Sequence, residues 1–122
     1  RFRLMVRVLD RVQLTDGGRL AYAEVTEQDL EETGAKGEDL NNLVNYGRNI
    51  DGVVVSVLFK HNSASTKASF RSTPDFDSAR VAACFGGGGH AAAAGATLEM
   101  PPDEAREAVL ACIRANFEEA AP

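Results

Sequence analysis

Four consecutive glycines followed by a histidine are the residues of this chain whose types and order most suggest chemistry. Gly86, Gly87, Gly88 and Gly89 directly precede His90. A glycine run exposes backbone N–H groups with no side chains over them, and such a row can form a concave site for an anion. His90 can donate a hydrogen bond to a phosphate oxygen, and a protonated imidazole adds positive charge. The pattern therefore predicts a phosphate-binding loop.

An ordinary structural role is the competing interpretation of this segment. Glycine runs are common in flexible surface turns, and the alanines at positions 91–94 offer small side chains for a packing seam. A short helix that begins near His90, as the following alanines allow, would add its first N–H groups to an anion site. The histidine directly after the glycines favours the binding interpretation.

Arg71 is a second candidate, on a strand predicted at residues 66–72. It alternates with Phe70, so its side chain should lie on the face of the strand away from the core. The planar guanidinium suits a phosphate or a carboxylate, and Ser69 and Ser72 supply hydroxyl groups beside it. The alternative is a solvated arginine, because most charged side chains are simply exposed.

Other polar residues are weaker candidates. Asn45, Tyr46 and Arg48 are possible ligand contacts, His61 is expected to be an exposed loop histidine, and Cys84 a small core residue. No group of histidines, cysteines and carboxylates has the spacing of a metal site. No serine, histidine and aspartate suggest a catalytic triad. The sequence therefore predicts neither a metal ligand nor a catalytic residue in this chain.

The apolar pattern predicts the elements that position these candidates. Residues 1–13 form an amphipathic helix in this interpretation, with Phe2, Met5, Leu9 and Val12 on one side and three arginines on the other. We further expect a turn at 15–18, a loop at 61–65, and strands at 20–25, 53–59, 66–72 and 96–100. A helix should follow Thr26, with Asp29 in a capping box and Gly34 as the stop, and others should lie at 39–46 and at 78–85, the last capped by Asp77. A final helix should begin at Asp103, and its inward residues should be Ala105, Val109, Cys112, Ile113 and Asn116 or Phe117.

This order of elements predicts an α/β fold of the α+β type. We expect a single domain with a mixed sheet of about four to five strands and helices packed on it. The length of 122 residues allows one domain with one core.

Composition and charge limit the possible ligands and location. The formal net charge is -5, whereas a protein that grips a long duplex by its phosphates is normally basic. A phosphate ligand must therefore be small or held by a local patch. The two cysteines, Cys84 and Cys112, lie far apart, which favours a reducing cytoplasm. No apolar run approaches membrane-spanning length, so no membrane is expected.

Several segments together resemble a known family. The run from Phe85 to His90, followed by Ala93-Ala94-Gly95, resembles the signature of the C-terminal DHH-associated domain of DHH-family phosphoesterases, which are related to RecJ exonucleases. The strand residues 67–72 are similar to the strand that precedes this signature. Leu43-Val44-Asn45 and residues 50–53 resemble the subgroup of oligoribonucleases (nanoRNases) and 3′-phosphoadenosine 5′-phosphate phosphatases. The resemblance extends from about Leu20 to the end of the chain.

The resemblance implies a two-domain enzyme, of which this chain is the substrate-binding part. Residues 1–18 would be the connecting helix from an N-terminal catalytic domain outside this chain, and residues 19–122 the DHH-associated domain. That N-terminal domain would hold manganese or another divalent metal, so no metal ligand and no catalytic residue is assigned here. The implied phosphate-binding residues are Arg71, Gly86, Gly87, Gly88, Gly89 and His90, with help from Ser69, Ser72 and Asn45.

The implied function is hydrolysis of short RNA, single-stranded nucleic acid or phosphorylated nucleotides by the full-length protein. The implied partners are the N-terminal DHH domain of the same chain and, in the full-length protein, a second copy in a homodimer. One alternative is a non-catalytic RNA-binding module like the C-terminal domain of alanyl-tRNA synthetase. A single-strand DNA exonuclease or a cyclic dinucleotide phosphodiesterase would share the same domain.

Overall fold

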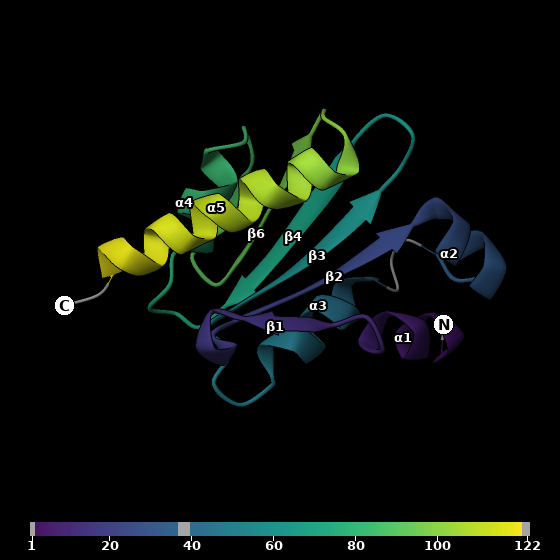
Figure 1. Cartoon of the computed structure of the whole chain (residues 1–122), viewed down its shortest axis with the longest axis horizontal. Helices are drawn as coiled ribbons and strands as arrows, with labels where there is room; N and C mark the ends of the chain where they lie inside the picture. Colours follow the sequence, from purple (N-terminus) through teal and green to yellow (C-terminus); the bar gives the residue numbers. More distant parts are fainter. Residues whose placement is uncertain (1, 37–39, 121–122) are drawn as a thin grey trace.

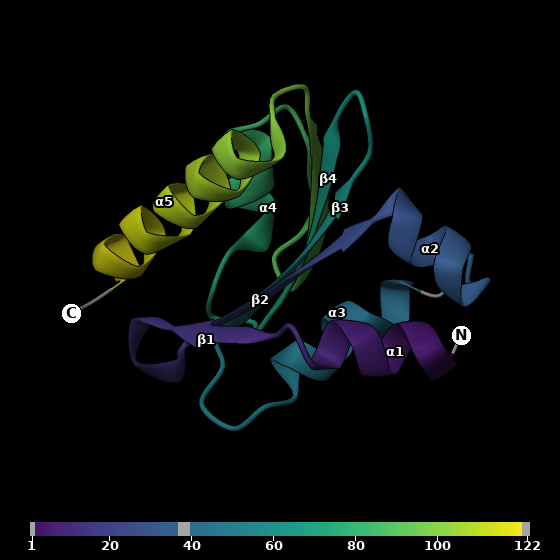
Figure 2. The same ribbon diagram turned by 45° about the vertical axis from the view of Figure 1, so that its right-hand side comes forward.

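A six-stranded mixed sheet organises the chain in the computed structural model, which describes residues 2–36 and 40–120. Helices α4 and α5 lie on one face of the sheet, and α1 and α3 lie on the other (Figures 1 and 2). The predicted fold class is confirmed. The elements in chain order are α1 (Phe2–Leu9), β1 (Gln13–Thr15), a 3-10 turn (Asp16–Gly18), β2 (Leu20–Thr26), α2 (Glu27–Thr33), α3 (Leu40–Arg48), β3 (Val55–His61), β4 (Thr66–Ser72), α4 (Ser78–Ala83), β5 (Gly88–His90), β6 (Ala93–Leu98) and α5 (Pro102–Ala120).

The strand order is β1-β2-β3-β4-β6-β5, and only β2 and β3 run parallel. The chain crosses between these two strands through α2 and α3, as a parallel connection requires. The other neighbours are antiparallel. The sheet has more strands than predicted because β1 and β5 were missed. Both are only three residues long, too short for an alternating pattern to reveal them.

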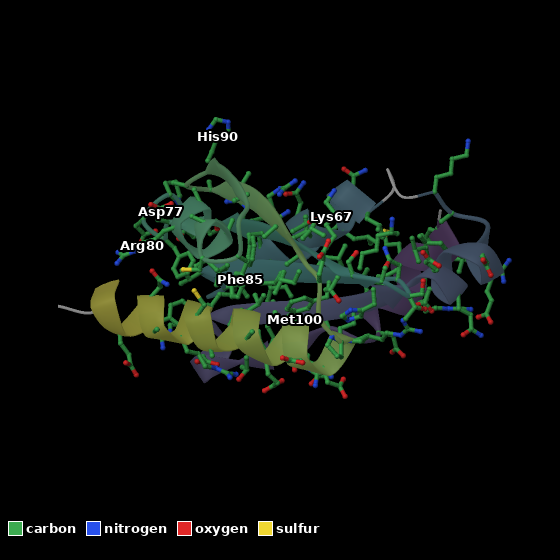
Figure 3. All side chains as sticks on the ribbon, turned by 90° about the horizontal axis from the view of Figure 1, so that it is seen from above. Lys67, Asp77, Arg80, Phe85, His90 and Met100 are labelled. Atoms are coloured by element: carbon green, nitrogen blue, oxygen red, sulfur yellow. The ribbon has the colours of Figure 1, made fainter. Side chains whose placement is uncertain are left out.

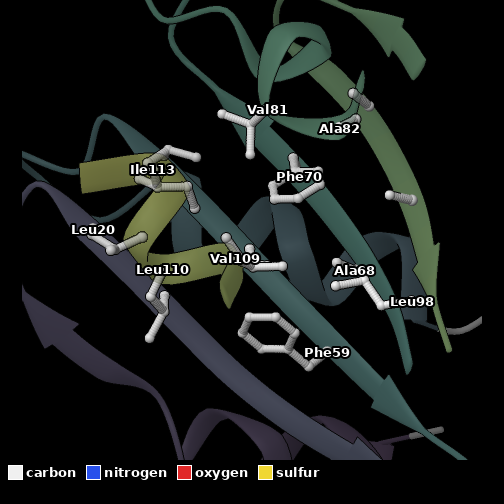
Figure 4. Packing of buried hydrophobic residues seen from close by; sticks show 14 of the residues in the cluster. Leu20, Phe59, Ala68, Phe70, Val81, Ala82, Leu98, Val109, Leu110 and Ile113 are labelled. Atoms are coloured by element: carbon white, nitrogen blue, oxygen red, sulfur yellow. The ribbon is translucent and has the colours of Figure 1, made fainter. Parts of the chain in front are cut away.

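The larger core lies between the sheet and α4 and α5. Alternate residues of the strands point to this face, and Figure 4 shows Phe59 and Phe70 of the sheet close to Val81 of α4 and Val109 of α5. All four of these side chains are fully buried. A smaller core on the opposite face joins β2 and β3 to α1 and α3 through Leu4, Val8, Ala23, Val25, Leu40, Leu43, Val44 and Leu58.

The N-terminal helix is shorter and faces another way than predicted. It ends at Leu9 rather than at residue 13, and it buries Leu4 and Val8 instead of the predicted Phe2 and Leu9. Phe2 is 70% exposed. The predicted division between residues 1–18 and 19–122 stays a prediction, although α1 packs on the smaller core and β1 extends the sheet.

Helix α2 has the caps that the sequence predicts. The Thr26 side chain accepts a hydrogen bond from the Asp29 N–H, the Asp29 carboxylate accepts one from the Thr26 N–H, and Gly34 ends the helix in the left-handed conformation. Asp29 is also buried beside Arg7 and Arg11, and its Oδ2 lies 2.6 Å from a guanidinium nitrogen of Arg11. This ion-pair group connects α2 to α1 and to the turn after it.

The prediction for His61 was wrong. His61 is the last residue of β3 and is buried, because its ring stacks on Phe59. Its Nδ1 lies 2.7 Å from the Thr66 hydroxyl and its Nε2 lies 2.9 Å from the Glu24 carboxylate. The carboxylate of Glu24 also accepts from Arg106 of α5. The histidine thus joins three strands and a helix in the described chain.

Helix α4 begins as predicted, with Asp77 as its cap, but it ends at Ala83. Cys84 therefore follows the helix and is exposed, which corrects its expected place in the core. The buried side chains of α4 are Ser78, Val81 and Ala82, and Cys84 lies off that stripe.

The predicted helix at 39–46 corresponds to α3, and position 39 falls outside the described residues. The inward stripe of α5 is confirmed at Ala105, Val109, Ile113 and Phe117, whereas Cys112 is partly buried. Within the described part of the chain, no helix has the length and apolar character needed to cross a membrane.

Candidate functional site

Arg71 and His90 lie in one row that crosses three neighbouring strands. Arg71 of β4 is opposite Ala93 of β6, and Ala93 is opposite His90 of β5. Residues opposite each other in a sheet point to the same face. Arg71 and His90 therefore share a face, with only the small Ala93 between them.

The guanidinium of Arg71 has no acidic partner among the described residues. Its Nη1 donates to the backbone carbonyl of Phe70 at 2.8 Å, and no ion pair involves it. The side chain is half-buried, whereas His90 is exposed and stands clear of the ribbon on the side away from α5 (Figure 3). An unpaired guanidinium beside an exposed imidazole can hold a phosphate through charge-assisted hydrogen bonds.

The glycine run is not the open row of N–H groups that the sequence suggested. The N–H groups of Gly86 and Gly87 donate to Ala83 and Ala82 and so end α4. Gly88 to His90 form β5, which pairs with β6. A tight turn at 91–92 replaces the helix expected near His90, and β6 begins at Ala93 rather than at residue 96. The alanines form a strand because Ala94 and Ala96 are buried where α4 packs closely on the sheet.

The four glycines differ in what their backbone requires. Gly86 has φ +79° and Gly89 has φ +142°, values that side chains rarely allow. A Cβ at Gly87 would lie 2.1 Å from the carbonyl oxygen of Gly95. A Cβ at Gly88, in contrast, would meet nothing within 4 Å, and its φ is not positive. Three of the four glycines are therefore required by the hairpin and its contact with α4, and Gly88 is not.

Ser72 holds the turn beside His90 and has no exposed surface with which to touch a ligand. It is fully buried, its hydroxyl lies 3.0 Å from the carbonyl oxygens of Ala91 and Phe76, and it accepts from the hydroxyl of Ser78 at 2.8 Å. The N–H of Ser78 also donates to Ala91 at 2.7 Å. The predicted help of Ser72 in substrate binding stays a prediction, and its buried hydroxyl contacts the turn rather than the open face.

The outer side of this part of the sheet carries two cations, an imidazole and no carboxylate. We define the open face as the outward residues of three strands: Lys67, Ser69 and Arg71 of β4, Ala93, Gly95 and Thr97 of β6, and Gly88 and His90 of β5. Ser69 is half-buried, whereas Lys67 is exposed and is labelled on the same side as His90 in Figure 3. The chain as a whole is acidic at -5, so this face is a local exception.

Four arginines on the other surfaces form ion pairs with carboxylates. Arg7 and Arg11 pair with Asp29, Arg106 pairs with Glu24, and Arg114 pairs with Asp16. Arg71 and Lys67 have no such carboxylate in the described part of the chain. Among the described residues, Arg3, Arg19 and Arg48 also lack one, and they lie outside the open face. The open face thus holds two unpaired cations and no carboxylate among its own residues, as a local site for an anion requires.

Sequence comparison identifies the family of this chain. The model of the DHHA1 domain matches residues 17–119, a range that contains every candidate site residue. The chain belongs to the DHHA1 domain family. This DHHA1 domain is 40% identical over 114 residues to the bifunctional oligoribonuclease and PAP phosphatase NrnA of Thermus thermophilus. The match covers 93% of this chain and 34% of that protein, so the chain spans about a third of the length of its curated relative.

Solved structures share the fold of this DHHA1 domain. An exopolyphosphatase-related protein from Bacteroides fragilis superposes with a TM-score of 0.89 at 25% identity, over 98% of this chain and 35% of that one. The C-Ala domain of Aquifex aeolicus alanyl-tRNA synthetase superposes with a TM-score of 0.59 at 20% identity, over 78% of this chain and 87% of that one. The second similarity concerns the fold alone.

Helix α3 of the DHHA1 domain packs on β3 and carries the exposed Asn45. Gly47 packs against Ser56 so closely that a Cβ there would overlap the serine hydroxyl. Ser56 is in turn the cross-strand partner of Arg71. Asn45 is exposed two residues before Gly47. No hydrogen bond in the described chain joins Asn45 to Arg71 or to the glycine run, so its contribution to ligand binding stays a prediction.

The described residues of the DHHA1 domain do not fit a metal site. Between residues 2 and 36 and between 40 and 120, no three His, Cys, Asp or Glu side chains come together in a group that could hold a metal ion. The chemistry that these residues support is binding and orientation of an anionic group. Sequence reasoning missed Lys67 as a candidate, although its alternation with Ser69 and Arg71 placed it on the same side of β4.

Proposed function

We propose that the open face binds phosphate groups of short RNA, other short single-stranded nucleic acid or phosphorylated nucleotides. The full-length protein would then hydrolyse their phosphoester bonds. The observation that carries this proposal is the row from Arg71 to His90 on a face with no carboxylate. An acidic domain with one cationic face suits a ligand with few phosphates, because a long duplex needs a larger basic surface.

The reaction itself would take place on a domain outside these residues. Divalent metal ions, of which manganese is our first expectation, would activate water and stabilise the leaving oxygen there. The DHHA1 domain would contribute binding energy: Arg71 and His90 hold a phosphate next to the bond that is cleaved, and Ser72 holds the turn that carries His90. Positioning of this kind lowers the barrier because the reacting groups no longer have to find each other.

Two features of the relatives support this division of roles. The Thermus thermophilus protein is named as an oligoribonuclease and phosphatase, and both activities act on phosphoesters. Two thirds of that protein lie outside the region similar to this chain. We propose that the full-length protein containing this chain likewise has a further part, which includes a metal-binding DHH domain. We also propose that this enzyme acts in the cytoplasm and that it can form a homodimer.

The experiment compares hydrolysis of a 5′-phosphorylated dinucleotide by the full-length protein and by its Arg71→Ala variant, with Mn²⁺ present. A lost charge-assisted hydrogen bond is typically worth about 1.5–3 kcal/mol, so kcat/KM should fall roughly 10- to 100-fold. Arg3→Ala is the matched control, because Arg3 is also an unpaired cation of the described chain but lies on α1. Unchanged efficiency in Arg71→Ala would contradict the proposed site.

A second arm of the experiment tests whether the DHHA1 domain is catalytic by itself. The chain of residues 1–122 should not hydrolyse the dinucleotide in the presence of Mn²⁺. Turnover by this chain at the rate of the full-length protein would contradict the division of roles. Binding of RNA by a full-length protein that hydrolyses nothing would favour a non-catalytic RNA-binding module.

A further inference from the structure

Two lysines lie directly opposite each other at the far end of the same sheet. Lys60 of β3 is the cross-strand partner of Lys67 of β4. Alternation places Lys67 on the side of β4 that carries Ser69 and Arg71, and Lys60 therefore points to that side as well. The Lys60–Lys67 pair thus borders the open face at the end away from Arg71.

This arrangement is unfavourable for the fold. Like charges at directly opposite positions of an antiparallel pair destabilise it. Neither lysine has an ion pair or side-chain hydrogen bond in the described part of the chain, although Lys60 is half-buried and loses part of its hydration. The stem of Lys60 can pack beside the buried Val25, its partner on β2, but Lys67 has only the small, exposed Thr97 opposite it on β6. This packing accounts for one lysine stem and not for two opposed ammonium groups. A bound anion would remove the repulsion.

We propose that Lys60 and Lys67 form a second phosphate subsite, which holds a later phosphate of an oligonucleotide whose first phosphate lies at Arg71 and His90. This inference rests on the proposed function and adds a preference for substrate length. The oligonucleotide would run along β4, over Ser69 and the small residues beside it. Lysine suits this end of the site, because a flexible point charge tolerates variation in the position of a phosphate.

The spacing sets the length of substrate that reaches both subsites. Four residues of a strand separate Lys67 from Arg71, which corresponds to about 13 Å. The phosphates of a stacked strand rise by about 3.4 Å per nucleotide, so about four nucleotides cover this distance. A dinucleotide can occupy only the subsite at Arg71 and His90, whereas a pentanucleotide reaches Lys60 and Lys67. The second subsite therefore affects only the longer ligand.

Calorimetry on the full-length protein tests this subsite, with divalent metal chelated so that the RNA is not cleaved. A 5′-phosphorylated dinucleotide and a 5′-phosphorylated pentanucleotide are titrated into the Lys60→Gln/Lys67→Gln double variant, into Arg71→Ala and into the control Arg3→Gln. The double variant should lose roughly 3- to 10-fold in affinity for the pentanucleotide and nothing for the dinucleotide. Its salt dependence for the pentanucleotide should be shallower by about 1.4 in log–log slope.

The possible outcomes separate this subsite from the proposed function. If the double variant binds both ligands as the wild type does, or loses affinity for both equally, the second subsite is wrong. A loss of affinity for both ligands in Arg71→Ala would still support the site at Arg71. If Arg71→Ala binds both ligands normally, the proposed function itself fails. Arg3→Gln should bind both ligands as the wild type does, since its charge lies on α1.

The variant Lys67→Glu should raise the stability of the domain and lower its affinity for the pentanucleotide. Lys67→Glu replaces the repulsion with a cross-strand pair to Lys60, so the melting temperature should rise by about 1–4 °C. The same change should weaken the pentanucleotide more than the double variant does, because it adds a negative charge to the subsite. A more stable Lys67→Glu protein with unchanged pentanucleotide affinity would overturn the proposal.

Discussion

The hydroxyl of Ser72 lies 3.0 Å from the carbonyl oxygen of Ala91, so a buried residue of β4 holds the turn that follows His90. Ser78 completes this contact, because its hydroxyl donates to Ser72 and its N–H donates to Ala91. The turn is thus fixed from inside the domain, while the imidazole before it stays exposed. A side chain can in this way matter for a binding site that it does not touch.

Ser72→Ala should destabilise the domain by about 1–3 kcal/mol, because the hydroxyl of Ser78 and a buried carbonyl lose their partner. Urea unfolding followed by circular dichroism measures this change. Ser69→Ala is the control, because Ser69 lies on the same strand but is half-buried, and its side chain makes no hydrogen bond to any described residue. Its effect should stay within about 0.5 kcal/mol. Equal stability of the two variants would contradict the role given to Ser72.

Two neighbouring glycines should respond in opposite ways to substitution. Gly87→Ala places a Cβ against the backbone at Gly95, so it should destabilise the domain by about 1–3 kcal/mol or more. Gly88→Val places its side chain over the open face, where nothing lies within 4 Å. It should leave the melting temperature nearly unchanged and weaken binding of a phosphorylated dinucleotide. A domain melted by Gly88→Val, without a separate binding defect, would favour a purely structural role for the run.

Arg71 and His90 should act together on one phosphate. We expect His90→Ala to lower kcat/KM of the full-length protein, and the double variant with Arg71→Ala to cost less than the sum of the two single changes. Arg71→Lys should restore only part of the activity, because an ammonium lacks the planar fork of a guanidinium. The values of kcat/KM for the wild type, the two single alanine variants and the double variant on one short RNA measure the coupling. Strict additivity would place the two side chains on different parts of the substrate.

Acid should weaken the domain partly through Asp29. The hydrogen bond from Arg11 is the main cause that holds the pKa of Asp29 well below its usual range, against the opposing effect of burial. The unfolded chain therefore binds a proton first, near pH 3.9. The stability that Asp29 contributes is complete above that pH and is lost as the pH falls through the lower pKa of the folded state.

Unfolding in urea between pH 6 and pH 2 checks this dependence. Asp29→Asn should be less stable than the wild type at pH 6, by about 1–2 kcal/mol as for a lost helix cap, and the difference should shrink toward pH 2. Glu99→Gln is the control, because Glu99 is an exposed carboxylate in the loop after β6. A difference between Asp29→Asn and the wild type that stays constant with pH would contradict this account.

Local signals in the sequence determined several features of the fold correctly. The Thr26 capping box, the Gly34 stop and the Asp77 cap depend on residues three positions apart, and the structure has all three. The β-branched run of β3 and the alternation of Phe70 with Arg71 gave the strand and its outward side. The resemblance carried by the glycine run and His90 gave the family. Each of these needs only neighbouring residues.

Features that depend on distant partners were missed or wrong. His61 looked like a loop residue, but Glu24 lies 37 positions before it and Arg106 follows much later in the chain. The alanines after His90 favour a helix on their own, yet β4 and β5 on either side draw them into a strand. Close packing and pairing outweigh local preference in both cases.

The sequence by itself therefore determined which residues have suitable chemistry: a glycine run, an imidazole and an outward guanidinium. Only the tertiary structure decided how they are arranged. Strand register places Arg71 and His90 in one row and puts Lys60 opposite Lys67. The backbone conformation and close contacts of the hairpin require three of the four glycines, and packing buries Ser72 beneath the turn. The physical reason is that residue type is a local property, whereas register, burial and charge pairing depend on contacts between segments far apart in the chain.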